Sequence, residues 1–326
     1  MKKDRGSGAK DEKSIITIMD GKNGLPYSKG LMASSIMATG LTPSQSYRVA
    51  QMVQDQLRAG EALYVTTKQL IDMTAEVLRA EMGEEYAEKY LKWQALSQID
   101  KPLVLLIGGA TGVGKSTIAT EVAHRLGIRR IVQTDAIREV MRAVFSKELM
   151  PTLHYSSFEA WRGLRAPLTS ERDRVIIGFE DQISAVAVGL QAVIERAVRE
   201  SLDIVIEGVH VVPGFIETQN FANAFVFPII IKVDEPQLHK SHFYVRDPGL
   251  ESHRPFKRYL ENFDNIRRIG SHIEDLAKSE KFPVITCYSL DATITSIIEV
   301  IYNEVFDKAK RLVSQGAKEE LYEDIY

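Results

Sequence analysis

The chain of 326 residues contains a single cysteine, Cys287, and carries little net charge. One cysteine excludes an intrachain disulfide framework and a CxxC metal site, and it fits a reducing compartment. The formal net charge of −3 gives no overall reason to expect nucleic acid or an anionic membrane as a partner. No apolar run approaches the roughly 20 residues that span a bilayer, and the charged N-terminus is unlike a signal peptide. The expectation is a cytoplasmic protein.

The composition is that of globular material, with 44% apolar and 26% charged residues, and the length suggests two domains. We expect a disordered tail over residues 1–13 and a small, mainly helical domain over 14–98. A strand over 15–19 with a turn at 20–24 predicts a hairpin that leads this domain. Capping boxes at Thr42 and Thr66 predict the starts of two of its helices.

Short apolar runs alternate with helical patterns throughout residues 99–326, which predicts a second domain. This alternation is typical of an α/β fold in which a five-stranded parallel sheet lies between two layers of helices. The expected strands cover 102–107, 130–134, 203–207, 226–233 and 282–286. The expected helices cover 116–126, 136–146, 171–200, 255–279 and 292–313. Residues 147–170 show no regular pattern and include two prolines.

The segment from Gly109 to Ser116 matches the P-loop pattern G-x-x-x-x-G-K-[ST] at every fixed position. It lies between a predicted strand and a predicted helix, the arrangement that directs backbone N–H groups at phosphate. A chance match is the alternative, and the local context argues against it. Lys115 would reach the β- and γ-phosphates of ATP, and Ser116 would bind Mg²⁺. The predicted ATP-binding residues are Gly109, Ala110, Thr111, Gly112, Val113, Gly114, Lys115, Ser116 and Thr117.

Two carboxylates follow predicted strands, at the sheet edge where ligands collect in such folds. Asp135 would act as general base for a substrate hydroxyl or orient waters on Mg²⁺, unless it only caps a helix. Glu207 occupies the position of a second magnesium-linked carboxylate or a base, with a structural ion pair as the alternative. The candidate metal ligands are therefore Ser116, Asp135 and Glu207.

Several cationic side chains could hold an anionic substrate or the transferring phosphoryl group. The basic stretch within residues 235–258 is predicted to form a lid, with Arg246 and Arg254 as its catalytic arginines beside Lys115 and Asp135. A solvated basic face is the alternative interpretation. The candidate substrate-binding residues are Arg138, Arg142, His154, Arg162 and His210.

Residues 99 to about 310 resemble the archaeal 2-phosphoglycerate kinase family. The segments that carry the resemblance are LIGGATGVGKSTIA, TDAIREVMR, KELMPTLHYSSFEAW and VIEGVHVVPG. Residues 14–97 resemble an ATP-cone domain through IMDGKNGLPYSKGLMASSI and EVLRAEMGEEYAEKYLKWQAL. This second match is degenerate, since Ile18-Met19 precede the turn and Pro26-Tyr27-Ser28 follow it. Lys22 and Lys29 are its candidate nucleotide contacts.

The resemblance implies a P-loop kinase that uses ATP and Mg²⁺ to phosphorylate the 3-hydroxyl of 2-phosphoglycerate, giving 2,3-bisphosphoglycerate. The partner would then be a small phosphorylated acid, with no nucleic acid and no membrane. A kinase for another phosphorylated acid, sugar or inositol phosphate is an open alternative, because a fold does not fix its acceptor. A nucleotide sensor without catalytic activity is the second open alternative. The sequence leaves the oligomeric state open.

Overall fold

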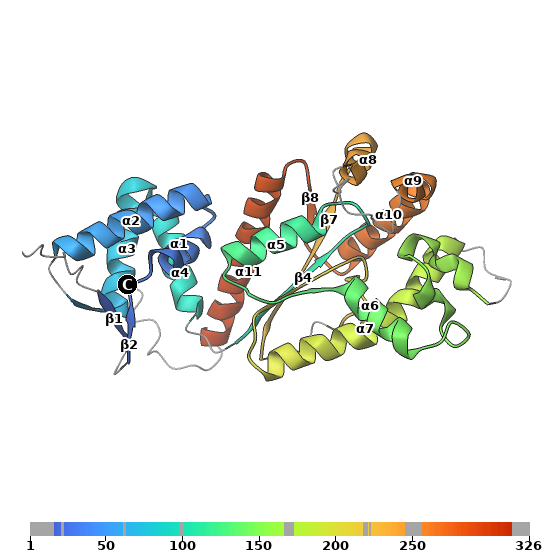
Figure 1. Ribbon diagram of the computed structural model, residues 1–326, viewed down its shortest axis with the longest axis horizontal. Helices are drawn as coiled ribbons and strands as arrows, with labels where there is room; N and C mark the ends of the chain where they lie inside the picture. The colour runs from blue at the N-terminus through green and yellow to red at the C-terminus, as the bar shows by residue number, and fades with distance from the viewer. Residues whose placement is uncertain are drawn as a thin grey trace, which may run out of the picture. The chain divides into compact units, whose positions relative to one another are not determined.

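The protein is described from a computed structural model, which places residues 16–20, 23–60, 63–97, 101–165, 173–217, 221, 223–244 and 256–314 (Figure 1). The chain divides into two compact units, residues 1–95 and 96–326. The predicted tail over 1–13 lies outside the described residues.

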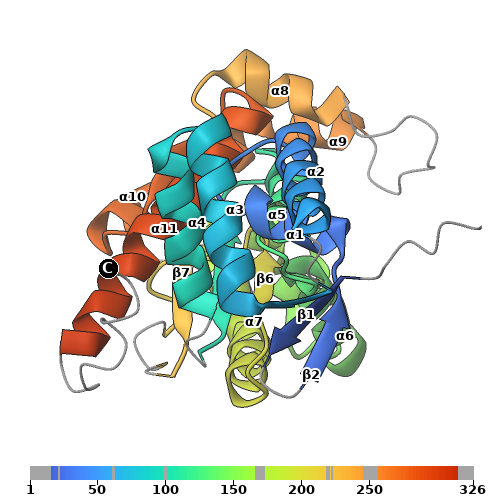
Figure 2. The same ribbon diagram turned by 90° about the vertical axis from the view of Figure 1, so that its left-hand side faces the viewer.

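The N-terminal unit is mainly helical, as predicted, and can be followed in Figure 2. Its elements are β1 (Thr17–Asp20), β2 (Asn23–Pro26), α1 (Lys29–Met37), α2 (Pro43–Ala59), β3 (Tyr64–Thr66), α3 (Thr67–Glu81) and α4 (Glu84–Ser97). β1 pairs antiparallel with β2 and parallel with β3. The capping boxes at Thr42 and Thr66 both form and start α2 and α3. The sequence pattern did not predict α1 or β3.

The predicted five-stranded parallel sheet is confirmed in the second unit. Its strands are β4 (Leu103–Gly108), β5 (Ile131–Gln133), β6 (Ile204–Glu207), β7 (Phe225–Lys232) and β8 (Val284–Thr286). The strand order is β5-β6-β4-β7-β8, and every neighbouring pair is parallel. β4 is therefore central, and its carboxyl end opens into the glycine-rich segment. Ligands in such sheets bind at this edge.

Helices cover both faces of the sheet, which gives the three layers seen in Figure 1. α5 and α11 contact each other on one side, and α7 contacts α6 and α10 on the other. The helices are α5 (Lys115–Arg125), α6 (Thr134–Val144), α7 (Arg174–Arg199), α8 (Pro236–Tyr244), α9 (Phe256–Glu261), α10 (Phe263–Ser279) and α11 (Leu290–Ser314). The segment without a regular pattern contains two 3₁₀ helices, η1 (Pro151–His154) and η2 (Ser157–Gly163).

Pro228 lies inside β7, although proline lacks the N–H that a strand in the middle of a sheet uses. It is paired in register with Leu106 of β4. The N–H of Ile230 donates to Pro283 O on the β8 side, so the missing N–H of Pro228, two residues earlier, faces that side too. β8 pairs only with residues from Ile230 onward. The proline therefore costs the sheet no hydrogen bond.

α7 is long and apolar enough to cross a membrane by length and composition, which the inspection of apolar runs did not suggest. Val186, Leu190 and Ile194 on this helix are fully buried, in one cluster with Val104 of β4 and Ile206 of β6. Core helices of folded domains pass the same test, and the packing identifies α7 as the helix that covers this face of the sheet.

Candidate active site

The P-loop is a turn of glycines between β4 and α5. Gly114 has φ +90° at the N-cap of α5 and no side-chain cap, so the first N–H groups of the helix are left for an external acceptor. Gly112 has φ +88°, and a Cβ there would lie 2.4 Å from the ring of Phe243. Glycine is thus required at Gly112 both for its backbone angle and for the close approach of α8.

The two polar side chains that end the P-loop are already engaged within the site. Lys115 Nζ donates to Ala110 O at 2.7 Å, and the side chain is buried. Ser116 Oγ donates to Glu207 Oε1 at 2.8 Å. Glu207 ends β6 opposite Ile107 of β4 and is only 4% exposed. The register of the sheet thus brings a buried carboxylate beside the first residues of α5.

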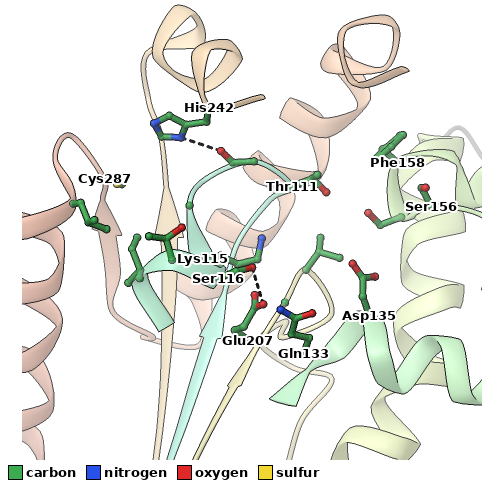
Figure 3. A pocket seen from close by; sticks show the side chains of 18 of the residues that line it. Thr111, Lys115, Ser116, Gln133, Asp135, Ser156, Phe158, Glu207, His242 and Cys287 are labelled. Carbon is green, nitrogen blue, oxygen red and sulfur yellow. Dashed lines mark hydrogen bonds between the residues drawn. The ribbon is translucent and has the colours of Figure 1, made fainter. Parts of the chain in front are cut away.

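A cavity of about 710 Å³ opens beside these residues (Figure 3). One wall, which we call the α6–η2 wall, consists of Gln133, Asp135, Arg138, Ser156, Ser157 and Phe158. On the other side of Lys115 in Figure 3 lies Cys287, in a second wall formed by residues 287–290. The remaining lining residues are Thr111, Gly112, Gly114, Lys115, Ser116, Thr117, Ile118, Glu207, Gly208, Val209 and His242.

Asp135 faces the cavity from the first turn of α6. The N-cap of α6 is Gln133, so the alternative interpretation of Asp135 as the cap is wrong: the helix starts one residue before it, at Thr134. The carboxylate is 46% exposed and forms an ion pair with Arg138 Nε at 3.3 Å. The helix dipole also favours an anion in this first turn. Asp135 can therefore present a charged oxygen to a bound molecule.

Arg138 lines the cavity, but its guanidinium is committed to the protein. It is 3% exposed, and NH1 donates to Leu153 O at 3.1 Å and to Tyr155 O at 2.9 Å. NH2 donates to Glu139 at 3.1 Å, and the same carboxylate accepts from Arg142 at 2.7 Å. Arg138 thus ties α6 to η1 and to the residue before Ser156.

The other predicted substrate contacts do not line this cavity. His154 Nε2 lies 3.0 Å from Phe145 O, and Arg162 pairs with Glu159 at 3.1 Å. Arg142 is held by Glu139, as described above. His210 is fully buried, so it could contact a substrate directly only if the residues that cover it moved away. Arg246 and Arg254 lie outside the described residues.

His210 bonds with both ring nitrogens inside the protein. Nδ1 lies 3.0 Å from Thr134 Oγ1, and Nε2 lies 3.1 Å from Gln182 Oε1. Burial lowers the pKa of His210 to about 4, which keeps the ring neutral near pH 7. The histidine therefore joins the end of β6 to α6 and α7.

Two histidines of α8 bond to backbone carbonyls of the P-loop. His239 Nε2 lies 2.8 Å from Thr111 O, and His242 Nδ1 lies 3.0 Å from Gly112 O. Burial lowers the pKa of His239 to about 4. Phe243 stacks on Tyr259 of α9 with centroids 4.8 Å apart, and Tyr259 lies 5.9 Å from the ring of Phe158.

This aromatic row connects the P-loop, through α8 and α9, to the α6–η2 wall. An ion pair between Arg258 of α9 and the buried Glu159 of η2 strengthens the same connection. Sequence patterns missed the row and the serines of the wall, because neither has a motif. Residues 287–290 could have been found, since they follow the last strand at the same sheet edge as the P-loop.

A parallel sheet of this order, with a P-loop after its central strand, defines the class of P-loop nucleotide-binding α/β proteins. The chain is similar in structure to a gluconokinase from Sinorhizobium meliloti, with a TM-score of 0.39 and 13% identity over 65% of this chain and 97% of that one. It is also similar to a shikimate kinase from Acinetobacter baumannii, with a TM-score of 0.34 and 13% identity over 69% and 99% of the two chains.

Sequence comparison gives the particular family. The chain is 43% identical to the 2-phosphoglycerate kinase of Methanothermobacter thermautotrophicus, over 84% of this chain and 89% of the relative. It is 42% identical to that of Thermococcus kodakarensis, over 93% and 99%. No protein-family model matches the chain. The chain belongs to the 2-phosphoglycerate kinase family.

Proposed function

We propose that this protein transfers the γ-phosphoryl group of ATP to the free hydroxyl of 2-phosphoglycerate, giving 2,3-bisphosphoglycerate and ADP. The observation that carries the proposal is one cavity in which the P-loop and Asp135 face the same space, in a chain of this family. Family membership favours this acceptor over a sugar or inositol phosphate and over a nucleotide sensor without catalysis.

The phosphates of ATP would bind to residues 109–117. The uncapped N–H groups at the start of α5 and the positive end of its dipole attract anions. Lys115 Nζ would exchange the carbonyl of Ala110 for oxygens of the β- and γ-phosphates. Cys287 lies on the far side of Lys115 from Asp135 (Figure 3), and the nucleoside would bind along the wall of residues 287–290 that includes it.

A divalent cation fits the oxygen atoms beside the P-loop. Magnesium prefers hard oxygen ligands, and the exposed Ser116 and the buried Glu207 supply a hydroxyl and a carboxylate next to the phosphate site. When bound, Mg²⁺ neutralises charge that develops on the transferring group. Ser116, Glu207 and Asp135 are the residues that would hold the ion or its waters.

Asp135 would accept the proton of the acceptor hydroxyl as the oxygen attacks phosphorus. A general base must lie within hydrogen-bond reach of that proton, and Asp135 projects into the cavity from the sheet edge. Its ion pair with Arg138 fixes the direction of the carboxylate. Arg138 would therefore serve the reaction by holding Asp135 in place.

The acceptor carries a carboxylate and a phosphate, so its site needs cations and hydrogen-bond donors. The hydroxyls of Ser156 and Ser157 line the α6–η2 wall and can donate to such oxygens. We retain Arg246 and Arg254 as the proposed cations of a lid over the transferring group. Contacts from Arg142, His154 or Arg162 would require these side chains to leave their present partners.

We propose that the N-terminal unit, residues 14–98, is an ATP-cone-like domain. Of its two candidate nucleotide contacts, Lys29 Nζ donates to Gln51 Oε1 at 3.0 Å, and Lys22 lies outside the described residues. We place the protein in the cytoplasm, acting on a small phosphorylated acid without nucleic-acid or membrane partners.

The proposal is tested by incubating the full chain with ATP, Mg²⁺ and 2-phosphoglycerate while following ADP release and the new phosphorus resonance. Matched reactions contain 3-phosphoglycerate or other phosphorylated polyols, or lack Mg²⁺. We expect turnover with 2-phosphoglycerate that depends on Mg²⁺. Turnover with another acceptor, alongside none with 2-phosphoglycerate, would overturn the acceptor assignment.

A further inference from the structure

Three buried polar side chains form a continuous row behind the α6–η2 wall without reaching the cavity. Thr134, Gln182 and His210 are each 0% exposed, and they come from α6, α7 and the loop after β6. Buried polar groups are costly unless they are fully hydrogen-bonded, so a row of this kind fixes the segments that it joins.

The amide group of Gln182, at one end of the row, fixes which atom donates in each hydrogen bond. Gln182 Nε2 donates to two carbonyls, Thr152 O at 2.6 Å and Tyr155 O at 3.0 Å. Both hydrogens of the amide nitrogen are then used, and Oε1 can only accept. His210 Nε2 must therefore carry the proton and donate to Gln182, which leaves Nδ1 to accept from the Thr134 hydroxyl.

Each end of the row touches a part of the cavity wall. Thr134 immediately precedes Asp135, the proposed base, in the chain. At the other end, the carbonyl of Tyr155 accepts from Gln182 and also from Arg138, and it precedes Ser156 and Ser157. Within this row, His210 is the side chain that connects Thr134, which precedes Asp135, to Gln182, which holds the backbone just before the serines.

The row is also closely packed. A Cβ on Gly208, two residues before His210, would lie 1.8 Å from Thr134 Oγ1. Glycine at this position lets the loop after β6 approach α6 closely enough for the bond to His210. Glu207 precedes Gly208, so the same short loop carries the carboxylate that bonds to Ser116.

We propose that His210 is a positioning residue with two separable roles. Through Nδ1 it fixes Thr134 and so the approach of Asp135 to the acceptor hydroxyl. Through Nε2 it fixes Gln182 and so the placement of the serines that hold the acceptor. This inference rests on the proposed function and adds to it a specificity-determining device that never touches the substrate.

The test replaces each ring nitrogen separately. In His210→Asn the shorter amide retains a polar atom near the position of Nδ1, which keeps the partner of Thr134 and removes the donor to Gln182. In His210→Gln the longer amide retains a donor near Nε2 and removes the acceptor for Thr134. The exposed His124→Gln, on the surface of α5, is the matched control.

We expect His210→Asn to raise KM for 2-phosphoglycerate about ten- to a hundred-fold with a smaller change in kcat, since a misplacement of about 1 Å caused by a distant mutation can have effects of this size. We expect His210→Gln to lower kcat by a similar factor and to leave that KM near the wild-type value. Both variants should keep the KM for ATP, and His124→Gln should match the wild type.

If His210 only stabilises the fold, kcat and the KM for 2-phosphoglycerate per folded molecule should stay unchanged, or should change in the same way in both variants. Either result would overturn the proposal. Amide hydrogen exchange over residues 151–157 is an independent measurement, expected to be faster in His210→Asn than in His210→Gln. Equal exchange in the two would contradict the Gln182 connection. Wild-type protein that does not use 2-phosphoglycerate would defeat the proposed function, whereas the exchange comparison still decides this inference.

Discussion

The phosphate-binding loop of the cavity comes from one stretch of chain, whereas the α6–η2 wall comes from several. Residues 109–117 are contiguous, and their main contribution is backbone geometry at glycines such as Gly112 and Gly114. The α6–η2 wall joins α6 and η2, and it depends on Gln182 of α7 and His210 after β6 for support. The first side is therefore determined locally, and the second depends on long-range packing.

The two sides nevertheless share a device for support. Each is held from behind by a buried neutral histidine, His239 under the P-loop and His210 behind the α6–η2 wall. The difference lies in what each one bonds. His239 bonds a backbone carbonyl of the loop itself, whereas His210 bonds two side chains from other elements. The predictions below separate the two sides, from the largest expected effect to the smallest.

The largest loss is expected from Lys115→Ala on the nucleotide side. Removing a cation from the transferring phosphoryl group should lower kcat by ~10³–10⁵-fold, by analogy with the range found for an arginine finger at this transition state. Steady-state ADP release measures the effect. A variant with more than a tenth of wild-type turnover would show that the P-loop lysine is not part of the catalytic machinery.

Asp135→Asn tests the α6–η2 wall, where Asp135 is expected to act as a base and not as a phosphate ligand. Loss of the base should lower kcat by ~10²–10⁴-fold. Affinity for ATP, measured by isothermal titration calorimetry, should stay close to wild type because the P-loop is untouched. Normal turnover in this variant would remove Asp135 as the base.

Acid should destabilise the folded protein through both buried histidines. Each has a folded pKa of about 4 against an ordinary value of 6.5, so between these values the unfolded chain binds protons that the folded chain does not. The free energy of unfolding therefore falls as pH falls through this window, by up to about 3 kcal/mol for each histidine. Urea unfolding at pH 7 and pH 4.5 should show a smaller drop for His239→Gln than for the wild type, and an unchanged drop for His124→Gln.

Comparing Gly112→Ala with Gly127→Ala should separate the effect of the close contact with α8 from the effect of backbone strain. The new Cβ would meet the ring of Phe243 in addition to adopting a left-handed angle, whereas Gly127→Ala has φ +71° and nothing within 4 Å. We expect Gly127→Ala to cost about 1–2 kcal/mol of stability, and Gly112→Ala to cost more and to weaken ATP binding. Equal losses of stability and unchanged ATP affinity would show that α8 does not restrain the loop.

Tyr259→Leu should have the smallest effect and should act on both sides of the cavity together. It removes the ring between Phe243 and Phe158, worth about 0.5–1.5 kcal/mol for each aromatic pair beyond its buried area. We expect few-fold increases in KM for ATP and for the acceptor with little change in kcat. Phe225→Leu, which breaks a stacked pair in β7, is the control and should leave both constants unchanged.

Sequence patterns were sufficient wherever the physical cause is local. An apolar run, a glycine turn and a periodic helix predicted β4, the P-loop and α5 within a residue or two. Capping boxes predicted the starts of α2 and α3 for the same reason. The start of α6 was missed because Gln133 caps it without a side-chain bond, so no capping signal exists in the sequence.

What the sequence by itself determined is the parallel α/β core, the phosphate-binding loop and, by similarity, the family. Only the tertiary structure decided which polar residues touch the cavity and which support it. His210 and Gln182 are 28 positions apart and join only because β6 and α7 pack together. Such contacts have no period and no motif, since they depend on how distant segments fill a shared core.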